Sequence, residues 1–162
     1  MLLWFTLSLF LTGAEGAGRA EDEHDALVKQ QRSLQARVAA LKQEQDYLQF
    51  QKRMYETDSK YLVINSKKKT AQLRYKNRLL KEIRFKAAPG LKLRPGQAAM
   101  TRKVEGKKER HALVFGNAFV IKWKLSEVPL PESSLPSIIM MKKDLLSFYY
   151  TAEPGMMVYV SP

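Results

Sequence analysis

The chain has 162 residues, a formal net charge of +12 and no cysteine. The length suits one ordinary domain with extensions. The absence of cysteine excludes disulfides, thiolate metal ligands and a lipid-modified N-terminal cysteine. The fold must therefore be held together by packing alone.

Residues 1–13 are nearly all apolar, and small residues follow them up to position 20. A run of this length is too short to cross a hydrocarbon core of about 30 Å as a helix. It is typical of a secretory signal, so residues 1–20 are predicted to be a signal peptide and the protein to be exported to a periplasm or cell envelope. One feature is atypical of a signal, since no Lys or Arg precedes the apolar run. An uncleaved N-terminal membrane anchor is the alternative.

Residues 21–58 are predicted to form a helix or coiled coil, because 21–57 lack Gly and Pro and are rich in Gln, Ala, Leu, Lys and Glu. Leucines recur every seven residues, at Leu27, Leu34, Leu41 and Leu48, and Tyr55 continues the series. This spacing favours a short parallel homodimer through these leucines. The seam position three residues before each leucine is polar except at Val38, which weakens the coil. The alternative is a single helix that lays its leucine stripe on the following domain.

Residues 59–162 are predicted to form a small β domain, so that the chain is mainly β with one long N-terminal α-helix. Residues 60–65, 70–75 and 78–85 are typical of an antiparallel meander. The remaining segments are predicted as a loop (87–110), a hairpin (111–123), an irregular stretch (127–137), a helix (142–152) and a final strand (156–160).

The order of these segments resembles the catalytic domain of the L,D-transpeptidases, the YkuD-like fold. Residues 60–65 with 78–82, residues 119–121, and residues 137–140 with 155–160 carry the resemblance. It implies a small YkuD-like β domain made of a meander, a hairpin, one short helix and a final strand. Members of this family cross-link peptidoglycan stem peptides with a cysteine nucleophile.

The resemblance places the family's catalytic residues on positions that have lost their chemistry. The histidine corresponds to Leu135, the cysteine to Ser137, the arginine to Ile139 and an upstream histidine to Lys122. Leucine cannot accept a proton, and a serine hydroxyl needs an adjacent base to become a nucleophile. The sequence therefore indicates a protein without catalysis, in which Ser137 serves a turn or a helix cap.

The excess positive charge lies in residues 60–124, which hold 19 bases against three acids. Such a field attracts anionic polymers. The candidate anion-binding residues are Lys67, Lys68, Lys69, Arg102, Lys103, Lys107, Lys108 and Arg110. A solvated face that keeps the protein soluble explains the same charge. Nucleic acid is not expected as a partner, because export removes the protein from the cytoplasm.

No metal site or cofactor is predicted, since the two histidines, His24 and His111, lie far apart in the sequence. The leading hypothesis is an exported, catalytically inactive L,D-transpeptidase-like protein that binds or organises peptidoglycan or another anionic envelope polymer. The alternative is a coiled-coil assembly or scaffold protein that binds a protein partner. Residual L,D-transpeptidase activity on peptidoglycan, with an unrecognised base, is the third hypothesis.

Overall fold

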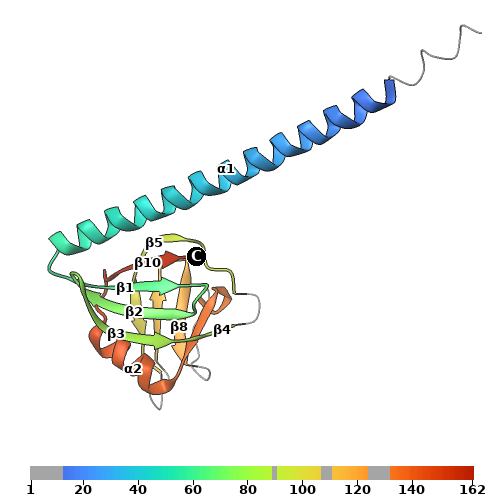
Figure 1. The fold of residues 1–162 in the computed structure, drawn as a ribbon. Coiled ribbons are helices and arrows are strands. Elements are labelled where there is room, and N and C mark those ends of the chain that lie inside the picture. Colours follow the sequence, from blue (N-terminus) through green and yellow to red (C-terminus); the bar gives the residue numbers. More distant parts are fainter. Residues whose placement is uncertain (1–12, 89–90, 107–110, 124–131) are drawn as a thin grey trace, which may run out of the picture. The chain divides into compact units, whose positions relative to one another are not determined.

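The computed structural model describes residues 13–88, 91–106, 111–123 and 132–162. The chain divides into two units, residues 1–44 and residues 45–162. Helix α1 (Gly13–Glu56) makes up the described part of the first unit, and its last turns belong to the second (Figure 1). The helix begins inside the segment predicted to be a signal peptide, most of which lies outside the described residues. Among the described residues, no helix is both long and apolar enough to span a membrane.

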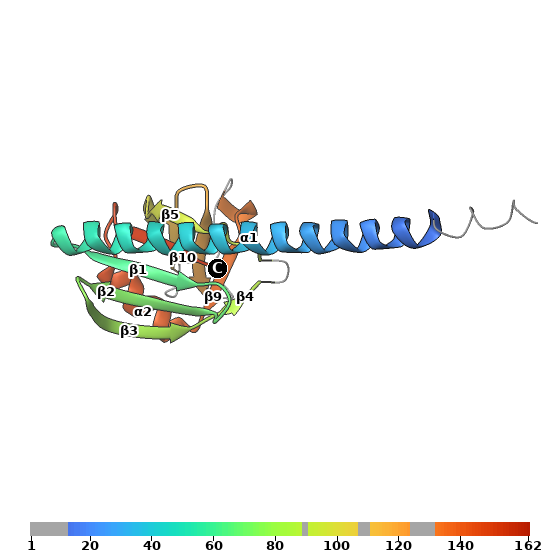
Figure 2. The same ribbon diagram turned by 45° about the horizontal axis from the view of Figure 1, so that its top comes forward.

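The first sheet of the β domain has the strand order β3-β2-β1-β10-β5. Strands β1 (Lys60–Asn65), β2 (Thr70–Tyr75) and β3 (Arg78–Arg84) form the predicted meander, which Figure 2 shows as three neighbouring ribbons. Strand β10 (Met157–Ser161) pairs with β1 in the parallel direction, and β5 (Gly96–Ala99) pairs with β10 in the antiparallel direction. The end of the domain thus returns to the strand that opens it.

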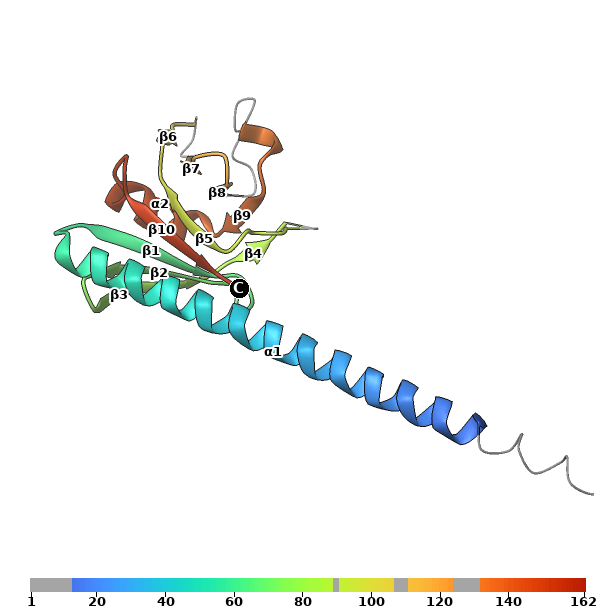
Figure 3. The ribbon, with the colours of Figure 1, turned by 90° about the horizontal axis from the view of Figure 1, so that it is seen from above.

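The second sheet has the strand order β4-β9-β8-β7-β6 and forms a separate layer (Figure 3). Strands β7 (Ala112–Phe115) and β8 (Phe119–Trp123) confirm the predicted hairpin, with Gly116 at φ 50° in its turn. Strand β9 (Ser137–Met140) follows a 3-10 turn (Glu132–Ser134) and pairs with β8 in the parallel direction. Strands β4 (Lys86–Ala87) and β6 (Arg102–Val104) form the two edges.

The loop predicted over residues 87–110 is wrong in part, because β5, β6 and the end of β4 lie within it. Each of these strands is only two to four residues long and is paired with a strand that lies further along the chain. A segment this short shows no alternation of apolar and polar residues, so only its distant partner makes it a strand.

The main core lies between the two sheets and helix α2 (Lys142–Thr151), which confirms the predicted C-terminal helix. Alternate residues of both sheets point into this core, as the two-residue period of a strand requires. Its fully buried members include Leu62, Ile64, Leu113, Phe115, Phe119, Ile121, Ile138, Leu145 and Phe148. Asp144 does not cap α2, whose N-cap is Met141. It is instead nearly buried in the first turn, with its Oδ1 3.5 Å from Lys81 Nζ.

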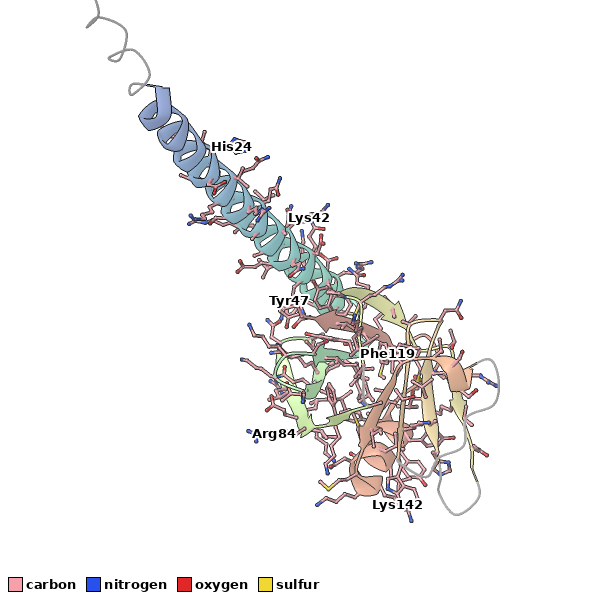
Figure 4. The ribbon with its side chains drawn as sticks, turned by 90° about the vertical axis from the view of Figure 1, so that its right-hand side faces the viewer. His24, Lys42, Tyr47, Arg84, Phe119 and Lys142 are labelled. Atoms are coloured by element: carbon pink, nitrogen blue, oxygen red, sulfur yellow. The ribbon has the colours of Figure 1, made fainter. Side chains whose placement is uncertain are left out.

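The outer face of the first sheet is covered by the last turns of α1. Phe50 is fully buried there, with its ring centroid 5.5 Å from that of Tyr61 and 5.4 Å from that of Tyr159. Tyr47, labelled in Figure 4, lies 5.0 Å from Tyr159, and its hydroxyl accepts a hydrogen bond from Arg74 Nη1. We call this cluster the aromatic pad; it consists of Tyr47, Phe50, Met54, Tyr61, Val63 and Tyr159.

The part of the leucine stripe that belongs to the second unit, Leu48 and Tyr55, does not pack on the sheet. Leu48 and Tyr55 are 57% and 55% exposed, although they lie in the same turns as the pad residues. At about 100° per residue, Phe50 lies about 160° around the helix from Leu48. For Leu48 and Tyr55, which belong to the second unit, the alternative in which the stripe lies on the following domain is therefore wrong, because a different side of the helix carries the aromatic residues.

Candidate ligand-binding face of the second sheet

Three of the positions onto which the resemblance carries the family's catalytic residues, Lys122, Ser137 and Ile139, lie on one face of the second sheet. In the pairing of β8 with β9, Ser137 is opposite Val120 and Ile139 is opposite Lys122. Register partners point to the same side of a sheet, and neighbours along a strand point to opposite sides. Because Ile121 and Ile138 point into the main core, these four residues lie on the other face, which we call the outer face.

The outer face has an apolar floor. Ala112, Val114 and Val120 are at most 2% exposed and form a small cluster of their own. Leu135 and Val104, both half-buried, pack against it. Leu135, onto which the resemblance carries the family's histidine, therefore serves as packing, and its side chain can exchange no proton.

Ser137 is half-buried at the start of β9, and its Oγ donates a hydrogen bond to the Leu135 carbonyl at 3.3 Å. His111 lies away from this hydroxyl: its ring stacks on Tyr149 with centroids 4.3 Å apart, and its Nδ1 accepts a hydrogen bond from Gly106 N at 3.4 Å. Among the described residues, His111 and His24 of α1 are the only histidines. The described surroundings of Ser137 thus contain no imidazole that could activate its hydroxyl.

Two lysines flank Ile139, onto which the resemblance carries the family's arginine. Lys86 of β4 is opposite Ile139 on one side, and Lys122 of β8 is opposite it on the other. Register partners have Cβ atoms about 5 Å apart, so both ammonium groups can reach the space over Ile139. Arg102 of β6 is opposite Val114 and adds a third cation near the other edge. Sequence reasoning missed Lys86, because nothing near residue 86 reveals that β4 pairs with β9.

The other predicted anion-binding residues lie elsewhere. Lys67, Lys68 and Lys69 follow β1 on the turn to β2 in the first sheet, with Lys69 at φ 54°. Lys103 points away from the outer face, with its Nζ 5.0 Å from the centroid of the Tyr149 ring. Burial, and after it the charge of Glu105, raise the pKa of Tyr149. Lys107, Lys108 and Arg110 lie outside the described residues.

A cavity of about 540 Å³ lies at another place in the β domain. It is lined by Met54, Thr57, Asp58, Ser59, Lys60, Tyr75, Thr151, Glu153, Pro154, Gly155, Met156 and Met157. At its rim Asp58 accepts a hydrogen bond from Tyr75, and Lys76 Nζ lies 3.2 Å from its carboxylate; these contacts lower the pKa of Asp58. None of the positions carried over from the family lines this cavity. The described residues hold no group of three acids or histidines that could bind a metal ion.

Neither a protein-family model nor a curated protein sequence matches this chain at a significant level. Several solved structures of L,D-transpeptidases do match its fold. The enzyme from Xylanimonas cellulosilytica has a TM-score of 0.52 at 12% identity, over 65% of this chain and 61% of that chain. The enzyme from Stackebrandtia nassauensis has a TM-score of 0.50 at 14% identity, over 64% of this chain and 55% of that chain.

The enzyme from Mycobacterium smegmatis also has a TM-score of 0.50, at 11% identity, over 64% of this chain and 58% of that chain. The matched region thus spans less than two thirds of each of these relatives. Identities this low establish a shared fold and leave the activity open. The β domain of this chain has the L,D-transpeptidase, YkuD-like fold that its sequence pattern indicated.

Proposed function

We propose that this protein is an exported, non-catalytic protein with the L,D-transpeptidase fold that binds anionic material of the cell envelope, with peptidoglycan as the first candidate. The observation that carries the proposal is the position of Lys86 and Lys122 on both sides of Ile139. The arginine that the resemblance would place on β9 is absent, but Lys86 and Lys122 on the two neighbouring strands bring positive charge to the same face.

The chemistry of the outer face suits binding better than catalysis. Acyl transfer needs a nucleophile and a base, and neither Ser137 nor Leu135 supplies them. Ala112, Val114 and Val120 are buried, so the apolar surface that a ligand would meet on this face comes from the half-buried Leu135 and Ile139. Such a surface with cations around it suits a ligand that carries carboxylates beside short alkyl groups. Stem peptides of peptidoglycan have this composition. The net charge of +12 adds long-range attraction to any anionic polymer.

Retention on purified peptidoglycan sacculi tests the proposal. The double variant Lys86→Gln/Lys122→Gln removes both lysines beside Ile139, and Lys67→Gln/Lys68→Gln removes the same charge from the β1–β2 turn. We expect the first variant to lose roughly five-fold in affinity at about 100 mM salt, and the second to lose much less, since exposed ion pairs contribute up to about 1 kcal/mol each. Equal losses would reduce the effect to general charge, and no retention of the unaltered protein would refute binding.

Residual transpeptidase activity is tested separately with a tetrapeptide donor. We expect no turnover above background, because the hydroxyl of Ser137 faces a carbonyl oxygen. Turnover that disappears in Ser137→Ala would restore the enzyme hypothesis and would overturn the non-catalytic part of the proposal.

A second candidate function, assembly through α1, is favoured by the exposed leucine stripe. Val38 is 64% exposed, as is Leu27, and the side of α1 that contacts the first sheet is a different one. Exposed leucines at seven-residue spacing gain free energy when a partner helix buries them. Sedimentation velocity at tens of micromolar should therefore show a dimer that Leu34→Ala/Leu41→Ala dissociates. A strict monomer would remove this candidate and leave the proposal for the β domain standing.

A further inference from the structure

We propose that the partner of the leucine stripe is a second copy of this chain whose helix runs antiparallel. This inference rests on the assembly function proposed above and goes beyond it, because it assigns the orientation of the two helices. The direction predicted from the leucine spacing alone was parallel. The residues beside the leucines favour the opposite direction.

In a parallel pair, each seam residue meets its own copy. Lys52 occupies the seam position between Leu48 and Tyr55, so two ammonium groups would face each other. Flanking positions also meet across a coiled coil, and in the parallel arrangement Arg37 would meet Lys42 of the partner subunit. By symmetry that repulsion occurs twice. Both clashes involve exposed residues of the described helix.

An antiparallel pair removes both clashes. When the helices cross between Ala39 and Ala40, Val38 packs on Leu41 of the partner subunit, and Lys52 lies beside Leu27 of the partner subunit. In the same register Arg37 meets Glu44 of the partner subunit, again twice by symmetry. Opposite charges replace like charges at the flanks. The long methylene stem of lysine can also cover a leucine while its ammonium group stays in water.

One group of residues favours the parallel direction. Gln31 and Gln45 would each meet their own copy there and could exchange amide hydrogen bonds, whereas each meets a leucine in the antiparallel register. Such hydrogen bonds replace those that the amides make with water in the separate helices, so their net contribution is modest. The unfavourable contact of two Lys52 ammonium groups has no such replacement, and the charges therefore decide the direction.

The β domain leaves the leucine stripe accessible at the C-terminal end of α1, where the helix contacts the first sheet. Leu48 and Tyr55 lie on the side of α1 away from Phe50 and Met54, which contact the first sheet. The antiparallel register ends with Tyr55 beside His24 of the partner subunit. The seam thus extends from residue 24 to residue 55, which corresponds to roughly 46 Å of helix.

Charge reversal at Arg37 distinguishes the two directions by the sign of its effect. Arg37→Glu creates two Glu–Glu contacts in the antiparallel dimer and two Glu–Lys contacts in the parallel dimer. We expect the dimer dissociation constant at low salt to rise about five-fold, since flanking pairs each change association by roughly two-fold in either direction. Arg37→Glu/Glu44→Arg should restore it. Arg32→Glu, the same change of charge off the stripe, is the matched control and should have little effect.

The absence of cysteine makes a second test direct, because a single introduced cysteine has no native competitor. His24→Cys and Tyr55→Cys proteins are mixed and oxidised gently. The antiparallel dimer should give a disulfide that joins one variant to the other, with little homodisulfide of either variant. Homodisulfides in each separate variant, together with tighter association of Arg37→Glu, would overturn the orientation and leave assembly intact. A monomer at 100 micromolar would overturn both, whereas binding to sacculi is independent of either result.

Discussion

The two sheets of the β domain have outer faces of opposite character. The first is covered by the aromatic pad, whose Phe50 comes from the helix that directly precedes β1. The second combines short aliphatic residues with Lys86, Lys122 and Arg102. The difference separates a structural face, which large rings cover, from a face on which cations surround a small aliphatic cluster.

The largest expected effect tests whether the first face is structural. Phe50→Ala should lower the free energy of unfolding by about 4 kcal/mol, because it removes a fully buried ring between Tyr61 and Tyr159. Leu48→Ala, two residues away and 57% exposed, should change it by about 0.5 kcal/mol or less. Urea denaturation measures both. Similar losses for the two variants would mean that the pad does not hold the helix end on the sheet.

The second prediction concerns the floor of the other face. Val120→Ala should cost about 2 kcal/mol, because it removes two buried methyl groups from a residue with no exposed surface. Ile139→Ala, at a half-buried position on the same face, should lower the free energy of unfolding by about 1 kcal/mol, which is less than the loss from Val120→Ala. An equal cost at the two positions would show that Ile139 belongs to the packed floor and not to its border.

The third prediction concerns Tyr159 of the pad. Burial first, and then the charge of Asp46, raise the pKa of Tyr159. A raised pKa in the folded state stabilises the fold below the unfolded value of about 10, and this stabilisation is lost as pH rises through the folded pKa. The urea midpoint of the unaltered protein should therefore fall further between pH 8 and pH 11 than that of Tyr159→Phe. A constant difference between the two across this range would exclude Tyr159 as a source of alkaline instability.

The smallest expected effect separates binding from stability on the second face. Lys86→Gln/Lys122→Gln should shift the free energy of unfolding by no more than about 0.5 kcal/mol, since surface substitutions away from packed positions have effects of this size. The same variant is expected to weaken retention on sacculi. If it unfolds at a clearly lower urea concentration, any loss of binding reflects a damaged β domain, and the two lysines are structural.

Local sequence patterns were enough to predict the longer elements of this protein. The meander, the β7–β8 hairpin and α2 each depend on residues close together in sequence, so alternation, turn residues and helix formers predicted them. Strands β4, β5 and β6 escaped prediction, because two to four residues carry too little pattern. Their pairing with β9, β10 and β7 is a property of the folded chain.

The sequence by itself determined that Leu135, Ser137 and Ile139 stand where the resemblance places the catalytic histidine, cysteine and arginine, because residue identity at those positions needs no coordinates. Only the tertiary structure decided that Lys86 and Lys122 flank Ile139, because sheet register joins strands about 50 and 15 residues apart. It also decided which side of α1 packs on the first sheet. The heptad spacing marks a stripe that a partner could bury. Phe50 and Met54 pack on the first sheet instead, because a ring and a long thioether fill the surface around Tyr61 and Tyr159.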